Sequence, residues 1–315
     1  MLGVGVVGIN HKTAGLLLRE AFAKKAAFLK ANPFSPYPTV FLSTCNRVEI
    51  YFSASDLAEA HSHILRSLQK QIGVDFEQSL YSFFGVSCFF HLCKVSAGLD
   101  SAILLESEIQ RQVKLAYAAG MHLNSAMHYV FQKALKVSKE IRYKNSSAPF
   151  VSLYHALWKM TCWKNKKILL VGYSEINRGL LSFLKHKKEE KITLCTEDPS
   201  RVSSSLFVKD RSCLHQWQDY DILVVAGRSY EPFIQGEGRK NQVIFDLGVP
   251  RNVDPNIGAL IYNIEQVHDW ISRNHHAGSL KENERFIWEK VMSLSHNFQL
   301  KSQRVRETAE MGSHL

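Results

Sequence analysis

Four short apolar runs, separated by segments with helical spacing, constrain the fold of this chain more than any other feature of its sequence. The runs lie at 166–172 (KKILLVG), 191–195 (KITLC), 221–225 (DILVV) and 243–247 (VIFDL). Continuous apolar strands of this kind are buried on both faces, as in parallel sheets that are covered by helices. Residues 176–186 have the spacing of a connecting helix. The pattern predicts a Rossmann-like, doubly wound α/β domain over residues 148–265.

The rest of the chain lies on either side of this domain. With 315 residues, the chain has room for about two domains and an appendage. Residues 1–147 mix strand-like runs with longer helical segments, including one predicted over 100–117, and indicate a separate α+β domain. From Glu265 onward the apolar spacing is helical, so residues 266–315 are expected to form a helical segment with a break near 274–279.

The loop after the first apolar run is where a doubly wound domain holds dinucleotide phosphates. It consists of Gly172, Tyr173, Ser174, Glu175, Ile176 and Asn177. Only the first glycine of the G-x-G-x-x-G pattern is kept, because Ser174 and Asn177 stand at the other two positions. Glu175 adds negative charge near a diphosphate, and Glu197 follows the second strand, where an acid usually binds the ribose of NAD. We therefore expect weak dinucleotide binding, with Arg201 or Arg228 supplying positive charge.

A tight polar break, Thr44-Cys45-Asn46-Arg47, separates two strand-like runs in the first domain. A thiol reacts as its thiolate, and a nearby cation such as Arg47 lowers the thiol pKa. The local sequence equally fits a buried strand-end cysteine beside a surface arginine. His91, in an apolar helical stretch, equally fits a core histidine. None of the six cysteines forms a C-x-x-C pair and no zinc spacing is completed, so no metal site is expected.

The charge of the chain is uneven. Its formal net charge is +10, and residues 1–148 hold sixteen basic against ten acidic side chains. This excess suits a polyanionic partner such as nucleic acid, although a basic surface without a partner fits it as well. No apolar run approaches the roughly 18 residues that span a bilayer. The apolar stretch at 2–9 lacks the basic flank of a signal peptide, so we expect a cytoplasmic protein with no membrane partner.

Four motifs together resemble the glutamyl-tRNA reductase family. They are 8–13 (GINHKT), 43–51 (STCNRVEIY), 95–101 (VSAGLDS) with His91 upstream of it, and 246–251 (DLGVPR). The similarity runs from residue 3 to about residue 290. Each motif alone is weak, but four in the right order at compatible spacing are specific.

The resemblance implies NADPH-dependent reduction of glutamyl-tRNA(Glu) to glutamate-1-semialdehyde, the first step of tetrapyrrole biosynthesis. Cys45 would form a thioester with the glutamyl group, and His91 would act near the reacting carbonyl as an acid/base or polarising donor. Arg47 would pair with the γ-carboxylate of the substrate. The substrate pocket would contain Thr44, Asn46, Arg47, Ser101, Glu106, Ser107, Glu108 and Gln112. NADPH would bind at residues 172–177, which makes 1–147 the catalytic, tRNA-binding domain and 148–265 the NADPH-binding domain.

This chain departs from the family pattern around Glu106 and in its tail. Leu105 and Ser107 replace a glycine and a proline, Glu108 replaces a glutamine, and Arg111 replaces a further glycine. The sequence ends soon after the connecting helix, which shortens the family's dimerisation region within 266–315. A homodimer and a complex with glutamate-1-semialdehyde aminotransferase both stay open.

Two alternative functions also stay open, because the glycine loop is degraded. In one, Cys45 takes the glutamyl group and water releases it, so that the protein acts as a glutamyl-tRNA esterase. In the other, the protein is a non-catalytic tRNA-binding scaffold with a vestigial Rossmann domain.

Overall fold

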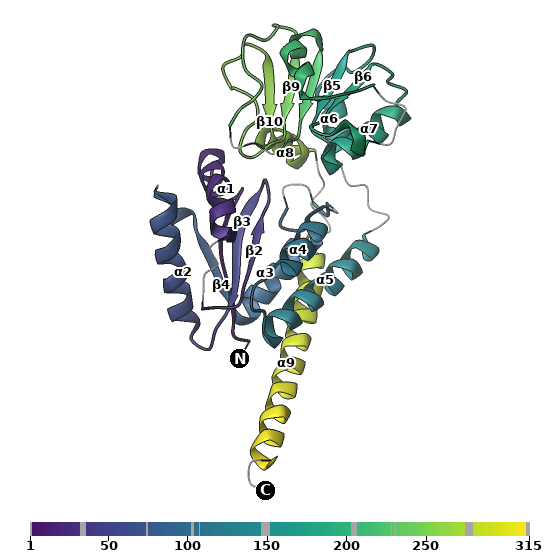
Figure 1. Ribbon diagram of the computed structural model, residues 1–315. Helices are drawn as coiled ribbons and strands as arrows, with labels where there is room; N and C mark the ends of the chain where they lie inside the picture. The colour runs from purple at the N-terminus through teal and green to yellow at the C-terminus, as the bar shows by residue number, and fades with distance from the viewer. Residues whose placement is uncertain are drawn as a thin grey trace. The chain divides into compact units, whose positions relative to one another are not determined.

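The computed structural model describes residues 2–31, 36–73, 75–101, 104–106, 108–145, 152–202, 207–227, 229, 231–274 and 280–312. The chain forms two compact units, coloured along the sequence in Figure 1. The first unit contains Met1–Gly15, Lys25–Phe150 and His276–Leu315. The second contains Leu16–Lys24 and Val151–His275, so helix α1 (Leu16–Ala31) contributes to both.

The first unit is built on a four-stranded antiparallel sheet with the order β2-β3-β1-β4. Its strands are β1 (Val4–Asn10), β2 (Thr39–Ser43), β3 (Arg47–Ser53) and β4 (Tyr81–Phe84). Gly8 on β1 pairs with Glu49 on β3. A Cβ atom at Gly8 would lie 2.8 Å from the Glu49 side chain and 2.6 Å from the carbonyl oxygen of Val48. Glycine at this position therefore makes room for a carboxylate inside the sheet.

Helices cover both faces of this sheet. They are α2 (Leu57–Ile72), α3 (Gly85–Ala97), α4 (Glu108–Ala118), α5 (Ser125–Lys144) and α9 (Leu280–Gly312), with the short 3-10 helix η1 (Glu77–Ser79). The main core lies between one sheet face and α3, α4, α5 and α9, where Phe89, Phe131 and Ile287 are fully buried. Helix α2 buries Ile64 and Leu68 and contacts β1 and β3. The α+β prediction for this part of the chain is confirmed.

The helix predicted over 100–117 begins only at Glu108, so that prediction was wrong for its first two turns. Gly98 ends α3 with a φ of 78°, and Leu105 also has a positive φ of 59°. The Arg142 guanidinium donates to the carbonyl oxygens of Leu105 (3.1 Å) and Glu106 (2.5 Å). These carbonyls thus find their partner on α5 instead of in a helix of their own.

The second unit holds a six-stranded parallel sheet with the order β10-β9-β8-β5-β6-β7. Its strands are β5 (Ile168–Val171), β6 (Ile192–Cys195), β7 (Phe207–Lys209), β8 (Ile222–Val225), β9 (Val243–Asp246) and β10 (Leu260–Asn263). This is the doubly wound order, which reverses between β5 and β8. The predicted Rossmann-like fold is confirmed.

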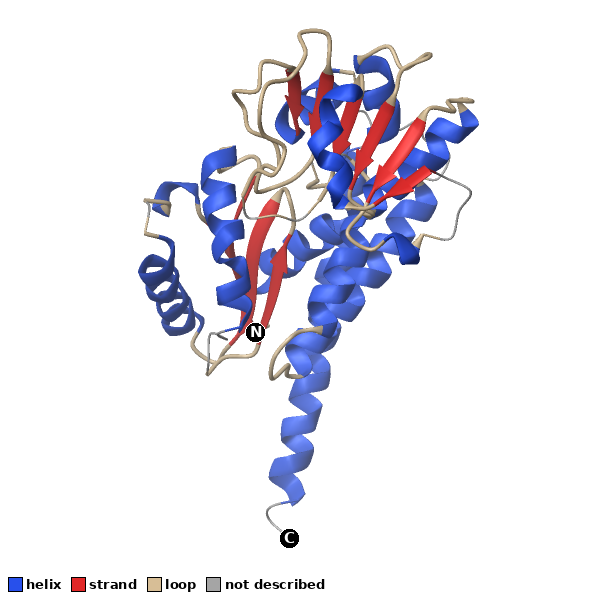
Figure 2. Ribbon diagram, turned by 45° about the horizontal axis from the view of Figure 1, so that its top comes forward, coloured by secondary structure: helices blue, strands red, loops and turns tan. Residues whose placement is uncertain are grey.

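Helices α6 (Leu153–Met160), α7 (Glu175–His186) and α8 (Ile264–Arg273) belong to this unit, together with the 3-10 helices η2 (Pro199–Arg201) and η3 (Arg211–Asp219). Figure 2 shows the strands of this sheet side by side with helices packed against them. Trp163 and Phe245 stack with ring centroids 5.9 Å apart and anchor the segment after α6 on β9.

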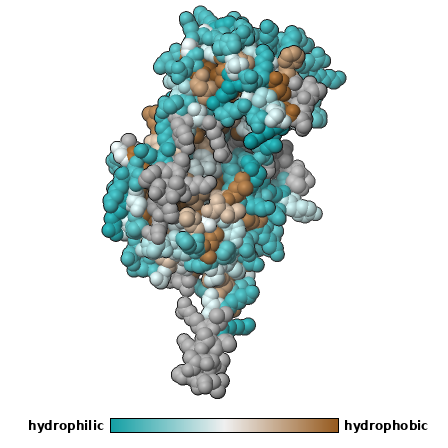
Figure 3. All heavy atoms as spheres, in the orientation of Figure 1, coloured by the Kyte–Doolittle hydropathy of each residue, from teal (hydrophilic) through white to brown (hydrophobic). Residues whose placement is uncertain are grey.

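The predicted helical segment 266–315 is divided between the two units. Helix α8 belongs to the second unit and α9 to the first, where the Tyr129 hydroxyl donates to the carbonyl oxygen of Leu294 at 2.8 Å. The expected break between them falls mostly on 275–279, outside the described residues. The molecular face in Figure 3 is mostly hydrophilic. Among the described helices, none combines the length and the apolar character needed to cross a membrane.

Candidate active site

Cys45 lies in the tight hairpin loop between β2 and β3, as its polar flanks predict. The Thr44 hydroxyl oxygen accepts hydrogen bonds from the backbone N–H groups of Asn46 (3.1 Å) and Arg47 (3.2 Å). The Thr44 N–H in turn donates to the carbonyl oxygen of Arg47 at 2.9 Å, and the His11 N–H donates to that of Asn46 at 2.9 Å. The loop is therefore fixed on both sides, with a half-buried Cys45 thiol that forms no disulfide.

Arg47 lies beneath this loop and is fully buried. Its Nη1 donates to Glu49 Oε1 at 2.7 Å, and its Nη2 donates to Asp100 Oδ2 at 3.0 Å and to the Asp100 carbonyl oxygen. Burial alone would lower the pKa of Arg47, but the adjacent carboxylates outweigh it and raise that pKa above its ordinary range. Both terminal nitrogens thus face carboxylates of the protein itself. Binding a substrate carboxylate at Arg47 requires an exchange of partners.

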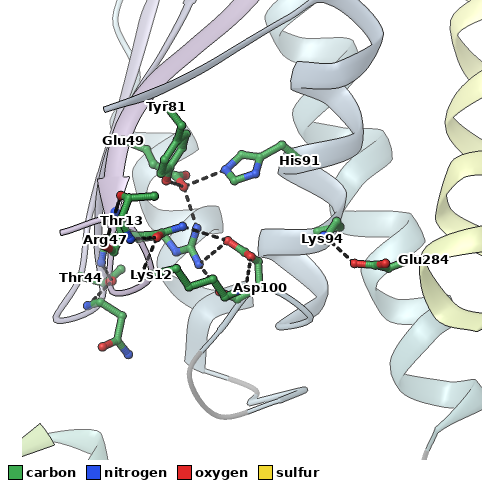
Figure 4. Close-up of polar contacts among 12 residues, drawn as sticks. Lys12, Thr13, Thr44, Arg47, Glu49, Tyr81, His91, Lys94, Asp100 and Glu284 are labelled. Atoms are coloured by element: carbon green, nitrogen blue, oxygen red, sulfur yellow. Dashed lines mark hydrogen bonds and ion pairs between the residues drawn. The ribbon is translucent and has the colours of Figure 1, made fainter. Parts of the chain in front are cut away.

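Glu49 is the centre of a buried hydrogen-bond network (Figure 4). Its Oε1 accepts from Arg47, from the Tyr81 hydroxyl at 2.5 Å and from His91 Nε2 at 2.9 Å, while its Oε2 accepts from the Tyr51 hydroxyl at 2.6 Å. Burial alone would raise the pKa of Glu49, but the charges of Arg47 and His91 and these hydrogen bonds lower it. Glu49 is therefore ionised, and it orients His91 through Nε2.

Asp100 forms the second carboxylate of this network. Its Oδ1 accepts from Lys12 Nζ at 2.6 Å, and its Oδ2 accepts from Arg47 and from Asn10 Nδ2 at 3.4 Å. Burial opposes ionisation of Asp100, but the cations Arg47 and Lys12 outweigh it and lower its pKa. Strand β1, the hairpin and the end of α3 are thus joined through one carboxylate.

The sequence alone assigned no role to six members of this network, namely Asn10, Lys12, Glu49, Tyr51, Tyr81 and Asp100. Three of the motifs contained five of them, but the motifs alone did not connect the residues. One local signal was available for Glu49. It lies two residues after Arg47 in a strand, and side chains two residues apart lie on the same face.

Of the remaining predicted pocket residues, Ser101 and Glu106 lie between α3 and α4, and Glu108 and Gln112 lie on α4. The Ser101 hydroxyl hydrogen-bonds to the Glu106 carboxyl, whose pKa is raised by burial. Glu108 accepts from Arg111 through Nε (3.0 Å) and Nη2 (2.5 Å), and from Gln112 Nε2 at 3.3 Å. Two departures from the family pattern, at 108 and 111, thus form one ion pair. Ser107 lies outside the described residues.

The loop after β5 keeps the geometry of a phosphate-binding turn. Gly172 has a φ of 95°, and a Cβ atom there would lie 2.9 Å from the carbonyl oxygen of Ala226. Ser174 caps α7 by accepting from the Asn177 N–H at 3.2 Å. A turn that requires glycine, followed by a helix N-terminus at the reversal of strand order, fits the phosphates of a dinucleotide.

Asn177 occupies the position of the third glycine and is fully buried. Its Nδ2 donates to the carbonyl oxygens of Val171 (2.9 Å), Gly172 (2.9 Å) and Val224 (3.4 Å). The side chain thus ties α7 to the ends of β5 and β8. Tyr173, Glu175 and Ile176 are half-buried around the first turn of α7.

Several comparisons identify relatives of the chain. A family model described as "Glutamyl-tRNAGlu reductase, N-terminal domain" matches residues 7–145. The glutamyl-tRNA reductase of Chlamydia muridarum is 33% identical over 298 residues, which cover 86% of this chain and 85% of that protein. That of Chlamydia trachomatis serovar L2 is 30% identical over 321 residues, which cover 91% and 92%.

Among solved structures, the glutamyl-tRNA reductase of Methanopyrus kandleri matches with a TM-score of 0.50 at 22% identity. The match covers 96% of this chain and 82% of that one, and it supports the fold. The sequence identity to the chlamydial enzymes, which extends over most of the chain, shows the family as well as the fold. This chain belongs to the glutamyl-tRNA reductase family.

Proposed function

We propose that this protein reduces glutamyl-tRNA(Glu) to glutamate-1-semialdehyde with NADPH, through a thioester at Cys45. The observation that carries this proposal is the Cys45 hairpin, which is fixed by backbone hydrogen bonds above the buried network of Arg47, Glu49 and Asp100. Membership of the family and a dinucleotide-type turn at Gly172 support it.

In the first step, the Cys45 thiolate attacks the ester carbonyl that joins glutamate to the tRNA. A C–S bond forms, the ester C–O bond breaks, and the tRNA leaves as its 3′ alkoxide, which must gain a proton. Covalent capture of this kind divides one difficult reaction into two easier ones. A fixed hairpin favours attack because it holds the thiol in one orientation.

His91 is the residue that we assign to proton transfer in this step. Its Nε2 faces the ionised Glu49, which only accepts hydrogen bonds, so Nε2 carries a proton. Nδ1 is then the ring atom that exchanges a proton with the substrate. Nδ1 can then pass a proton to the leaving oxygen, while the Glu49 carboxylate keeps the ring oriented through Nε2.

Arg47 is proposed to hold the γ-carboxylate of the glutamyl group, in exchange for one of its carboxylate partners. Its planar fork matches a carboxylate, and Lys12 can keep the displaced Asp100 neutralised. Thr44, Asn46, Ser101, Glu106, Ser107, Glu108 and Gln112 are proposed to complete the pocket.

The second step depends on the nicotinamide cofactor. When bound, NADPH supplies the hydride that converts the thioester into the aldehyde and releases Cys45 as the thiolate. Gly172 and Ser174 would approach its phosphates through backbone and hydroxyl groups, and Asn177 would keep the turn in place.

Product analysis with glutamyl-tRNA tests this function. We expect semialdehyde when NADPH is present, and release of tRNA with a glutamyl group retained on the protein when it is absent. Free glutamate as the main product in both cases would instead identify an esterase. Binding of glutamyl-tRNA without any product would identify a scaffold.

A further inference from the structure

The strand ends beside the predicted cofactor loop carry two arginine–acid pairs. After β6, Glu197 Oε1 lies 3.0 Å from Nη1 of Arg211, and Asp198 Oδ2 lies 3.0 Å from Nε of Arg201. The Arg201 pair is local, because both residues belong to the turn that forms η2. The Arg211 pair connects two strands, because Arg211 follows β7 and Glu197 follows β6.

Backbone hydrogen bonds relate this second pair to the glycine turn. The Gly172 N–H donates to the carbonyl oxygen of Cys195, the last residue of β6, at 2.8 Å. The Thr196 N–H donates to that of Lys209, the last residue of β7, at 3.0 Å. The glycine turn, Glu197 and Arg211 therefore lie at three adjacent strand ends along one edge of the sheet. In a doubly wound domain, the adenosine ribose of a dinucleotide binds at the end of the second strand, which here is β6.

The surroundings of Arg211 suit a phosphate ligand. Its guanidinium lies 4.9 Å from the ring centroid of Phe233, which restricts the plane of the fork. The side chains of Arg211 and Glu197 are 43% and 71% exposed, so their ion pair is weak and readily exchanged. A phosphate carries more charge than a carboxylate and accepts both parallel N–H bonds of the fork.

We propose that Arg211 selects NADPH over NADH by binding the 2′-phosphate, which displaces Glu197 from its guanidinium. The proposal rests on the proposed use of a nicotinamide cofactor. The positive charge that distinguishes NADPH from NADH is thus assigned to the end of β7. The family pattern places this charge after the second strand of the domain, where this chain has Glu197 and Asp198. Glu197 then competes with the phosphate and weakens NADPH binding.

Calorimetric titration of the full chain with NADPH, NADH, 2′,5′-ADP and 5′-AMP tests this assignment without turnover. For Arg211→Gln we expect the affinity for NADPH and 2′,5′-ADP to fall about ten- to a hundredfold, with changes below about twofold for NADH and 5′-AMP. For Glu197→Gln the NADPH affinity should rise, by up to about fivefold. Arg201→Gln is the matched control and should leave the NADPH-to-NADH ratio unchanged.

The assignment is overturned if Arg211→Gln leaves the ratio of NADPH to NADH affinity unchanged, including the case in which it weakens both cofactors equally. It is also overturned if Arg201→Gln, and not Arg211→Gln, changes that ratio. Neither result bears on thioester formation at Cys45, which is measured without cofactor. Failure of this assignment is therefore distinguishable from failure of the proposed function.

Discussion

The Cys45 hairpin and the loop after β5 both lie at strand ends and are both proposed to be functional, but they are held in place by different means. Side chains support the hairpin from beneath, where the buried Arg47 forms ion pairs with two buried carboxylates, Glu49 and Asp100. The backbone defines the second loop, through the positive φ of Gly172 and the N-terminus of α7.

This difference explains where the chain keeps the family's pattern and where it departs. Removing one partner of a buried ion pair strongly destabilises the folded protein. This restricts substitution in residues 43–51, which match the family motif closely. A site built from backbone groups tolerates new side chains if their polar atoms are satisfied. Asn177 illustrates this for its amide nitrogen, because Nδ2 donates to three carbonyl oxygens where the usual pattern has glycine. Its buried Oδ1 has no hydrogen-bond partner among the described residues.

Substitution of Glu49 should give the largest loss of stability. Glu49→Gln leaves a buried Arg47 with less compensating charge, and we expect it to lower the free energy of unfolding by about 3–5 kcal/mol. Urea titration measures this loss. Glu59→Gln, on the exposed face of α2, is the control and should stay within about 0.5 kcal/mol. Equal losses of unfolding free energy in the two variants would show that the charge of Glu49 does not contribute to stability.

The acid side of the stability profile should depend on the same network. The pKa values of Glu49 and Asp100 are lowered in the folded protein, so between the unfolded values (about 4) and the folded ones the unfolded chain binds more protons. Their contribution to stability is present above about pH 4 and is lost as the pH falls further. Urea titrations from pH 7 to pH 3 should give a steeper acid slope for the wild type than for Glu49→Gln. Parallel slopes would contradict the assigned pKa shifts.

Substitution of Asn177 should cost less than substitution of Glu49. Asn177→Ala removes a buried amide that donates to three carbonyl oxygens, which we expect to destabilise the protein by about 1–3 kcal/mol. Thermal or urea unfolding measures this effect, with Arg178→Ala on the exposed face of α7 as the control. Equal losses of unfolding free energy in the two variants would show that the hydrogen bonds of Asn177 do not stabilise the loop.

The smallest effect is expected for the pair of departures on α4. Glu108 and Arg111 are three residues apart on α4 and partly exposed to solvent, so their coupling should be only about 0.3–0.5 kcal/mol in a double-mutant cycle with Glu108→Gln and Arg111→Gln. A coupling well above about 1 kcal/mol would mean that this pair forms part of a more buried structure.

Local sequence patterns predicted most of the fold because the four runs at 166–172, 191–195, 221–225 and 243–247 consist mainly of apolar residues. The short strands β4, β7 and β10 lack that signal and were not predicted. The start of α4 was misplaced because the decisive donor, Arg142, belongs to another helix.

The candidate site was predicted one loop at a time. Cys45 and Arg47 stand out because polar residues interrupt two strands. The contacts that join them into a site connect residues far apart in the chain. His91 meets Glu49 across 42 residues, and Asp100 meets Arg47 across 53. Such contacts depend on the packing of α3 against the sheet, which no local pattern contains.

The central claim, that the hairpin presents Cys45 as the nucleophile, is tested most directly by the mass of the intact protein after mixing with glutamyl-tRNA in the absence of NADPH. We predict a single added glutamyl group, mapped to Cys45 by peptide analysis and absent from Cys45→Ala, with tRNA released in equal amount. Release of tRNA by Cys45→Ala at the wild-type rate, or a glutamyl group mapped to another residue, would contradict the account.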